Sequence, residues 1–387
     1  MAIPVAQPRL VLGLQTGLQT NIKGNAHFIN DEEVIYPVGG VLCVHNFYQR
    51  RQKFIKLGDK GQNVTSISVS PNRRIIAIAE SGEKPFATLY DAQTCKKRKQ
   101  ILLPADRECP AREFSAMSFT ADSRSILVVT GDPEWTLYLY KCEKGKMESM
   151  TRANNSNGTG TVVQIANNPT DSNLVVLVGN QLFRMLACSE NSWRQFGFCK
   201  ADQINITCAA WLTQDRLLAG TIDGRIMALE NGDIKAIYTA TEFMVLNFKV
   251  TEGGEGNVAA IEEIEFTKYG DTQEIRALFN FNKGFAFAHA PGTVYLFEKE
   301  TPHKYRRRNI FKIPDNHIEH EEAEETSHEV MNEVNFLSIN NSEDRLLATC
   351  NETQLYVVRL WGQDLNAAPE IQFQEMGMNL HHGGGKI

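Results

Sequence analysis

The stretch TSISVSPNRRIIAIA, residues 65–79, decides the fold of this chain. Apolar and small polar residues alternate up to Val69, a polar turn containing Pro71 follows, and a second apolar run begins at Ile75. Alternation with a period of two indicates a strand with one buried face, and a short polar turn between two such runs indicates a β-hairpin. We therefore expect two antiparallel strands joined by the turn SPNRR.

The same hairpin pattern recurs along the chain, as FTADSRSILVV at 119–129, WLTQDRLLA at 211–219 and INNSEDRLLA at 339–348. A period of roughly 40–50 residues is typical of repeat architectures, in which each unit buries its apolar faces against its neighbours. The strand pattern divides the chain into seven four-stranded units, which span 24–56, 64–103, 114–150, 161–196, 206–238, 275–313 and 334–373. These units predict an all-β fold, a seven-bladed β-propeller of degenerate WD40-type repeats.

We assign residues 1–376 to the propeller and residues 377–387 to the start of a further repeat or to a linker. The apolar run at 9–14 is placed to complete the last blade and so to latch the ring. Two insertions interrupt the regular spacing, at about 241–272 and at 314–329. Both are expected to be surface excursions, because inserted backbone without ladder partners has to meet water.

Composition and charge restrict the possible functions. The chain has 387 residues, 42% of them apolar, and a formal net charge of −6, which argues against a dedicated nucleic-acid binder. None of the eight cysteines forms a CxxC pair, so neither a zinc site nor a redox motif is indicated. Residues 1–14 lack the pattern of a secretory signal, and no apolar run approaches the roughly 20 residues of a membrane span. We expect a soluble intracellular protein that binds neither nucleic acid nor membrane.

Sequence patterns that carry catalysis are missing. There is no GxSxG elbow, no phosphate-binding loop, no GxGxxG after a strand and no HExxH, so we predict no catalytic residue and no cofactor. The acidic stretch 315–329 contains His317, His320 and His328. Its composition is that of a solvated loop, and we predict no metal site there.

The WD dipeptide that ends the third strand of an ideal blade is largely replaced. Tyr90-Asp91 stands there in the second unit, Tyr140-Lys141 stands there in the third, and RLW at 359–361 comes nearest in the seventh. The fifth unit keeps the turn GTIDG at 220–224, where Asp223 is expected to accept backbone hydrogen bonds. Such a role is structural.

Two basic clusters are the candidate partner contacts. Lys96, Lys97, Arg98 and Lys99 lie in the outer strand of the second unit, and a second cluster precedes the outer strand of the sixth, namely Arg306, Arg307 and Arg308. One interpretation is contact with an acidic partner, such as a tubulin tail, and another is nuclear import. The structural alternative is that these charges protect exposed strand edges from pairing with other chains.

Several stretches resemble one family of WD-repeat proteins. They are KGN at 23–25, VIYPVG at 34–39, SPNRR at 70–74, CKKRK at 95–99, PGTVYLFEK at 291–299 and QLY at 354–356. The family is that of cilia- and flagella-associated protein fifty-seven, and the chain is similar to its N-terminal propeller. Its members continue into a second propeller and a long coiled coil, and this chain shows no heptad tract.

The resemblance implies a non-enzymatic adaptor in the cytoskeleton of the cilium or flagellum. It would dock inner dynein arms and regulatory assemblies on doublet microtubules, with tubulin as a further partner. Two alternatives stay open: a protein-interaction propeller of another intracellular assembly, nuclear or translational, and a propeller hydrolase. The hydrolase would require a nucleophile, a base and an acid that converge in one pocket.

Overall fold

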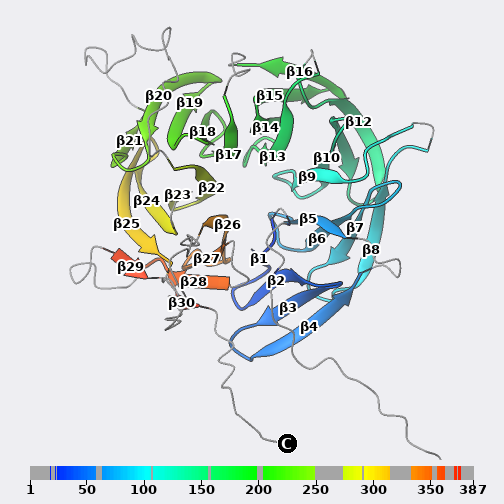
Figure 1. Ribbon diagram of the computed structural model, residues 1–387, viewed down its shortest axis with the longest axis horizontal. Coiled ribbons are helices and arrows are strands. Elements are labelled where there is room, and N and C mark those ends of the chain that lie inside the picture. The colour runs from blue at the N-terminus through cyan, green and yellow to red at the C-terminus, as the bar shows by residue number, and fades with distance from the viewer. Residues whose placement is uncertain are drawn as a thin grey trace, which may run out of the picture.

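The structure is a computed structural model. It describes residues 18, 22, 24–57, 63–105, 108–155, 158–197, 204–248, 273–289, 292–313, 333–350, 355–361, 370–372 and 374–375. All helix or strand structure in these ranges is β-strand, and the strands form seven sheets arranged as blades around one axis (Figure 1). We number the blades 1 to 7 in chain order. None of the described residues forms a helix that could cross a membrane.

Blades 1 to 4 each have four antiparallel strands that run in chain order from the axis to the rim. Blade 1 contains β1 (His27–Phe28), β2 (Glu33–Val38), β3 (Val41–Asn46) and β4 (Arg51–Lys56). Blade 2 contains β5 (Val64–Val69), β6 (Ile75–Glu80), β7 (Phe86–Asp91) and β8 (Lys97–Leu102). Blade 3 contains β9 (Phe114–Phe119), β10 (Ser125–Thr130), β11 (Thr136–Lys141) and β12 (Lys146–Arg152). Blade 4 contains β13 (Thr161–Asn167), β14 (Leu174–Asn180), β15 (Leu182–Ser189) and β16 (Ser192–Phe196).

Blades 5 to 7 complete the ring. Blade 5 contains β17 (Ile206–Trp211), β18 (Arg216–Thr221), β19 (Arg225–Glu230) and β20 (Asp233–Thr239). Blade 6 contains β22 (Ile275–Phe281), β23 (Gly284–His289), β24 (Thr293–Thr301) and β25 (Lys304–Lys312), and two further strands pair with β25, β21 (Val245–Asn247) and β29 (Glu370–Gln372). Blade 7 contains β26 (Val334–Ile339), β27 (Arg345–Cys350), β28 (Leu355–Arg359) and β30 (Gln374–Glu375).

The predicted fold class is confirmed: the protein is an all-β, seven-bladed propeller. The hairpin quoted first is β5 and β6, joined by the turn at 70–74. The second strand of a blade has neighbouring blades on both faces, so every residue of β10 is buried. This double burial explains why such strands read as continuous apolar runs. The segments 9–14, 314–329 and 377–387 lie outside the described residues, and our assignments for them stay predictions.

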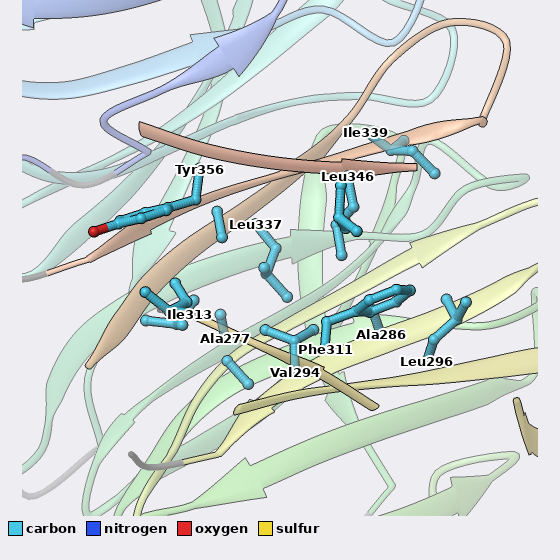
Figure 2. Packing of buried hydrophobic residues seen from close by; sticks show 14 of the residues in the cluster. Ala277, Ala286, Val294, Leu296, Phe311, Ile313, Leu337, Ile339, Leu346 and Tyr356 are labelled. Carbon is cyan, nitrogen blue, oxygen red and sulfur yellow. The ribbon is translucent and has the colours of Figure 1, made fainter. Parts of the chain in front are cut away.

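Apolar side chains fill the spaces between neighbouring blades. In the cluster between blades 6 and 7, Ala286 and Phe311 face Leu337 and Leu346 (Figure 2). All four side chains are buried, and burial of one large apolar side chain stabilises a fold by about 1.5–3 kcal/mol. Every blade therefore depends on its two neighbours for stability.

The start of the predicted insertion at 241–272 differs from our expectation of a surface excursion. Its first residues belong to blade 6, where β21 pairs antiparallel with β25 and Phe243 and Leu246 are buried. Phe243 stacks against Tyr238 of blade 5, with ring centroids 4.3 Å apart, and packs against Phe297 of blade 6 at 4.6 Å. The insertion begins as a structural bridge between two blades, because its aromatic residue fills the space between them.

Blades 7 and 1 close the ring through side chains of both blades and of blade 2. Ser338 of β26 accepts the Phe28 amide of β1 at 3.2 Å, and Ser342 donates to Asp31. Arg73, in the turn of blade 2, donates to the carbonyl of Phe28 at 2.5 Å and to that of Ile339 at 2.6 Å. One guanidinium thus joins the first and the last blade.

Candidate interaction surfaces

The inner strands surround a central channel of about 680 Å³. Its polar side chains join neighbouring blades. Gln164 of β13 donates to the carbonyl of Ala209 at 3.0 Å and accepts its amide at 2.9 Å. The Thr207 hydroxyl donates to the carbonyl of Ile275, and Asn167 donates to that of Phe119. These polar groups satisfy backbone groups of the adjacent blade, which is a structural role.

Burial keeps one imidazole of the channel and several thiols of the blades neutral. His27 lies with Nε2 3.3 Å from the carbonyl oxygen of Ile67, and burial lowers the pKa of its imidazole to about 4. Burial also raises the pKa of the Cys43 thiol to about 11 and that of Cys208 to about 12. Thiols with such pKa values are poor nucleophiles at neutral pH. Among the described residues, no group of three or more His, Cys, Asp or Glu side chains could hold a metal ion.

The polar turns between the first two strands of the blades form hydrogen bonds from blade to blade. Ser123 of blade 3 accepts the Asn72 amide of blade 2 at 3.1 Å. Ser172 of blade 4 accepts the Asp122 amide of blade 3 at 3.3 Å, and Asn168 donates to the carbonyl of Gln214 in blade 5 at 2.8 Å. The polar turn of one repeat is therefore part of its interface with the next repeat.

The first basic cluster lies at the rim, as predicted. Lys97, Arg98 and Lys99 belong to β8, Lys96 immediately precedes this strand, and all four side chains are exposed. Arg98 forms an ion pair with Asp91, whose pKa is lowered to about 2 by the Thr94 amide and by Arg98. The three lysines form no ion pair with any described residue.

The second basic cluster lies within β25 and not before it, because this strand begins at Lys304. Arg306 pairs with Glu300 at 2.5 Å, and Arg308 approaches Glu298 at 3.6 Å. Arg307 is half-buried, donates to the carbonyl of Thr241 at 3.1 Å and lies over the ring of Tyr295. Acidic side chains of the same blade thus compensate two of these arginines, and the third holds the start of the 241–248 segment.

Edge protection explains the second cluster poorly. The outer side of β25 is paired with β21 at one end and with β29 at the other, so these arginines do not guard an open edge. In the described part of the chain, β8 pairs only with β7. The edge-protection interpretation therefore still applies to Lys96–Lys99, where it competes with partner contact.

Further cations, which the sequence analysis did not single out, extend the first cluster onto blades 1 and 3. Burial raises the pKa of the Cys95 thiol, and Lys53 of β4, which pairs with Glu33 of its own blade at 3.1 Å, partly opposes this effect from the neighbouring blade. The stem of Lys99 packs against Gly145 in the β11–β12 turn. The strands β4, β8 and β12 follow one another along the rim in Figure 1. We call the exposed cations of their outer hairpins the basic belt, which comprises Arg50, Arg51, Lys53, Lys56, Lys96, Lys97, Arg98, Lys99, Lys144 and Lys146.

The repeat itself contains the signal that identifies these residues. Outer strands occupy the same place in every unit, so comparing the charges of RRQKFIK at 50–56 with those of KKRK at 96–99 reveals two basic hairpins in succession. Only the structure shows that these two basic hairpins lie next to each other in neighbouring blades.

Asp223 has the structural role that we predicted, although its contacts include side chains where we expected backbone amides. Its carboxylate accepts the Thr221 hydroxyl and pairs with Arg225, and these contacts lower its pKa against the opposing effect of burial. Trp361, nearest to the WD position, donates its indole N–H to the carbonyl of Glu343 at 2.7 Å. Both side chains stabilise the turns of their own blades.

The blades, their order around the channel and the polar turns define a β-propeller of the WD40 type. No family model matches the chain. It is 27% identical over 384 residues to cilia- and flagella-associated protein 57 of Mus musculus, and this match covers 94% of the chain and 30% of the mouse protein. Cilia- and flagella-associated protein 57 C of Tetrahymena thermophila matches 46% of the chain at 21% identity, over 14% of its own length. The resemblance inferred from the sequence is confirmed.

Similar solved structures show the fold alone. The crystal structure of the RRP9 WD40 repeats matches with a TM-score of 0.58 at 12% identity, covering 87% of this chain and 92% of that one. A chain of the mitotic checkpoint complex matches with a TM-score of 0.61 at 10% identity, covering 94% and 100%. The chain spans less than a third of the mouse relative, so partners of that whole protein are not established for it.

Proposed function

We infer that the protein is a non-enzymatic WD-repeat scaffold of the ciliary axoneme, which docks inner dynein arms and regulatory assemblies on doublet microtubules. The observation that carries this proposal is the match to mouse cilia- and flagella-associated protein 57 along nearly the whole chain. A match to cilia- and flagella-associated protein 44 of the same organism, at 19% identity over 69% of the chain, supports it.

The use of polar groups in the fold favours docking over chemistry. Channel groups such as Gln164 and Thr207 are occupied in joining blades, whereas the cations of the basic belt are exposed on the rim. A scaffold needs a rigid body with several accessible surfaces, and a closed ring of interdependent blades provides both.

Localisation tests this proposal. We expect a fluorescently tagged chain in ciliated cells to concentrate along the axoneme and to remain there after detergent extraction, with proximity labelling that enriches inner dynein arm subunits. The tag alone is the control. A tagged chain that accumulates in the nucleus, or on ribosomes, and is absent from cilia would overturn the proposal in favour of another intracellular assembly.

A further inference from the structure

The basic belt gathers positive charge on one part of the rim, although the protein as a whole is acidic. The outer hairpins at 47–57 and 92–102 contain Arg50, Arg51, Lys53, Lys56 and the 96–99 cluster but no Asp or Glu, although the chain carries a net charge of −6. The outer hairpin of blade 3 carries Lys144 and Lys146 together with Glu143 and Glu148. Those of blades 4 and 5 mix signs as well, since Arg194 stands with Glu190 and Lys235 stands with Asp233. Strand position alone therefore does not account for the belt.

Lysines of the belt are close enough to act together on one ligand. Residues two apart on a strand are separated by roughly 7 Å, which is within the Debye length of about 8 Å at physiological ionic strength. Lys97 and Lys99 are such a pair, and Lys53 reaches the turn at Cys95 from the neighbouring blade. Acidic side chains of their own blades compensate two belt cations, Arg98 by Asp91 and Lys53 by Glu33 at 3.1 Å, whereas Lys97 and Lys99 form no ion pair with a described residue.

The edge of β8 adds a second recognition element. In the described chain this strand has a partner on its inner side only, so the outer side presents backbone N–H and C=O groups. Blade 6 demonstrates that an outer strand of this propeller accepts further strands, since β21 adds to β25 antiparallel and β29 adds to it parallel. A polypeptide can use such an edge, whereas a nucleic acid cannot.

Resting on the proposed scaffold function, we propose that the basic belt docks an extended acidic segment of a partner protein. The segment lies along the outer edge of β8, and its carboxylates meet Lys96, Lys97 and Lys99 together with cations of β4 and of the β11–β12 turn. Recognition combines main-chain hydrogen bonds with long-range attraction, so it tolerates many acidic sequences and is sensitive to salt.

Binding of fluorescein-labelled decaglutamate to the purified full chain, followed by anisotropy, tests the proposal. We expect Lys97→Glu/Lys99→Glu to weaken binding roughly tenfold or more, because each exposed pair contributes a small factor and reversal replaces attraction by repulsion. The matched variant Arg194→Glu/Lys235→Glu changes the same charge on the outer strands of blades 4 and 5 and should bind as the unmodified chain does. Equal loss in both variants would overturn the proposal.

Two further probes test separately the strand addition and the chemical class of the partner. Decaglutamate with alternate N-methylated residues cannot form a strand ladder and should bind more weakly, and equal affinity would overturn the strand-addition geometry. A DNA duplex that binds the belt more tightly than decaglutamate would overturn the assignment to protein.

The outcomes also separate this inference from the proposed function. If the tagged chain is absent from cilia while decaglutamate still requires Lys97 and Lys99, the ciliary role fails and the belt chemistry stands. If the tagged chain is axonemal but Lys97→Glu/Lys99→Glu binds decaglutamate normally, the belt inference fails alone.

Discussion

At the scale of single residues, the turn between the first two strands of a blade imposes the most specific requirements on backbone conformation and hydrogen bonding. Its fourth residue adopts a left-handed backbone in three blades, with φ of 55° at Arg73, 60° at Ser123 and 55° at Glu343. Its first residue accepts the amide that begins the second strand, as Ser70 does for Ile75 at 2.9 Å. These features explain why polar residues recur at positions where the apolar pattern is interrupted.

Replacing Arg73 by Met should lower the free energy of unfolding by about 2–3 kcal/mol, because two buried carbonyls lose charged donors. Urea denaturation followed by tryptophan fluorescence measures the change. Arg74→Met, at the exposed neighbouring position, is the matched control and should stay within about 0.5 kcal/mol of the unmodified chain. Equal losses in the two variants would contradict the bridging role of Arg73.

His27 predicts a pH dependence with a defined sign. Its pKa in the folded protein is about 4 and lies below the ordinary value of 6.5, so between these pH values the unfolded chain binds a proton that the folded chain does not. Stability should therefore fall as the pH decreases from 6.5 to 4. The expected loss is about 2 kcal/mol, less than the full shift in pKa corresponds to, since the imidazole borders the open channel.

Thermal unfolding at a series of pH values, compared between the unmodified chain and His27→Gln, isolates this effect. Other histidines with lowered pKa values, such as His45 and His289, contribute equally to both proteins. Parallel pH profiles for the two proteins would show that His27 is not responsible.

At the scale of elements, β21 shows how a segment outside the regular repeat becomes part of a blade. Only three residues pair with β25, so the hydrogen bonds alone provide little stability. The packing of Phe243 among aromatic rings of blades 5 and 6 holds the segment in place. The segment is therefore held mainly by apolar side chains, Phe243 before the strand and Leu246 within it.

Phe243→Ala should destabilise the protein by about 3–5 kcal/mol, and Phe243→Leu by less, because a smaller cavity remains. Met244→Ala changes the adjacent exposed side chain and serves as control, with an expected effect below about 0.5 kcal/mol. Chemical denaturation measures all three variants. A loss for Phe243→Ala no greater than that for Met244→Ala would mean that the segment contributes nothing to the fold.

At the scale of the whole molecule, the contact between blades 7 and 1 is where the apolar packing of the described residues is thinnest. Its cluster contains the fewest buried hydrophobic residues of the seven clusters in the described chain, and the outer strand β30 pairs over two residues. Local opening follows low local packing, so we expect the ring to open first at this contact.

Buried thiols report on this opening. Cys43 belongs to the cluster between blades 7 and 1, and Cys208 belongs to the cluster between blades 5 and 6. Under native conditions, pulsed alkylation with mass spectrometry should modify Cys43 faster than Cys208, and Arg73→Met should accelerate the reaction of Cys43 alone. Equal rates, or faster reaction of Cys208, would contradict the expectation that the ring opens first at this contact.

Part of the candidate surface was predictable from the sequence. Lys97, Arg98 and Lys99 were placed on an outer strand correctly, because outer strands recur at a constant place in each unit, whereas Lys96 immediately precedes this strand. Arg306–Arg308 were placed before their strand, since the nine residues of β25 exceed the usual strand length of the repeat. Their ion pairs with Glu298 and Glu300 depend on strand register, which a single sequence does not specify.

The sequence by itself determined the class of fold, the number of blades and the limits of most strands, because apolar alternation and polar turns are local patterns that each unit repeats. Only the tertiary structure decided which polar residues are occupied in joining blades and which cations lie together on the rim. The physical reason is that these contacts join residues of different blades, such as Lys99 with Gly145 or Arg73 with Ile339. Such proximity arises only when the ring closes.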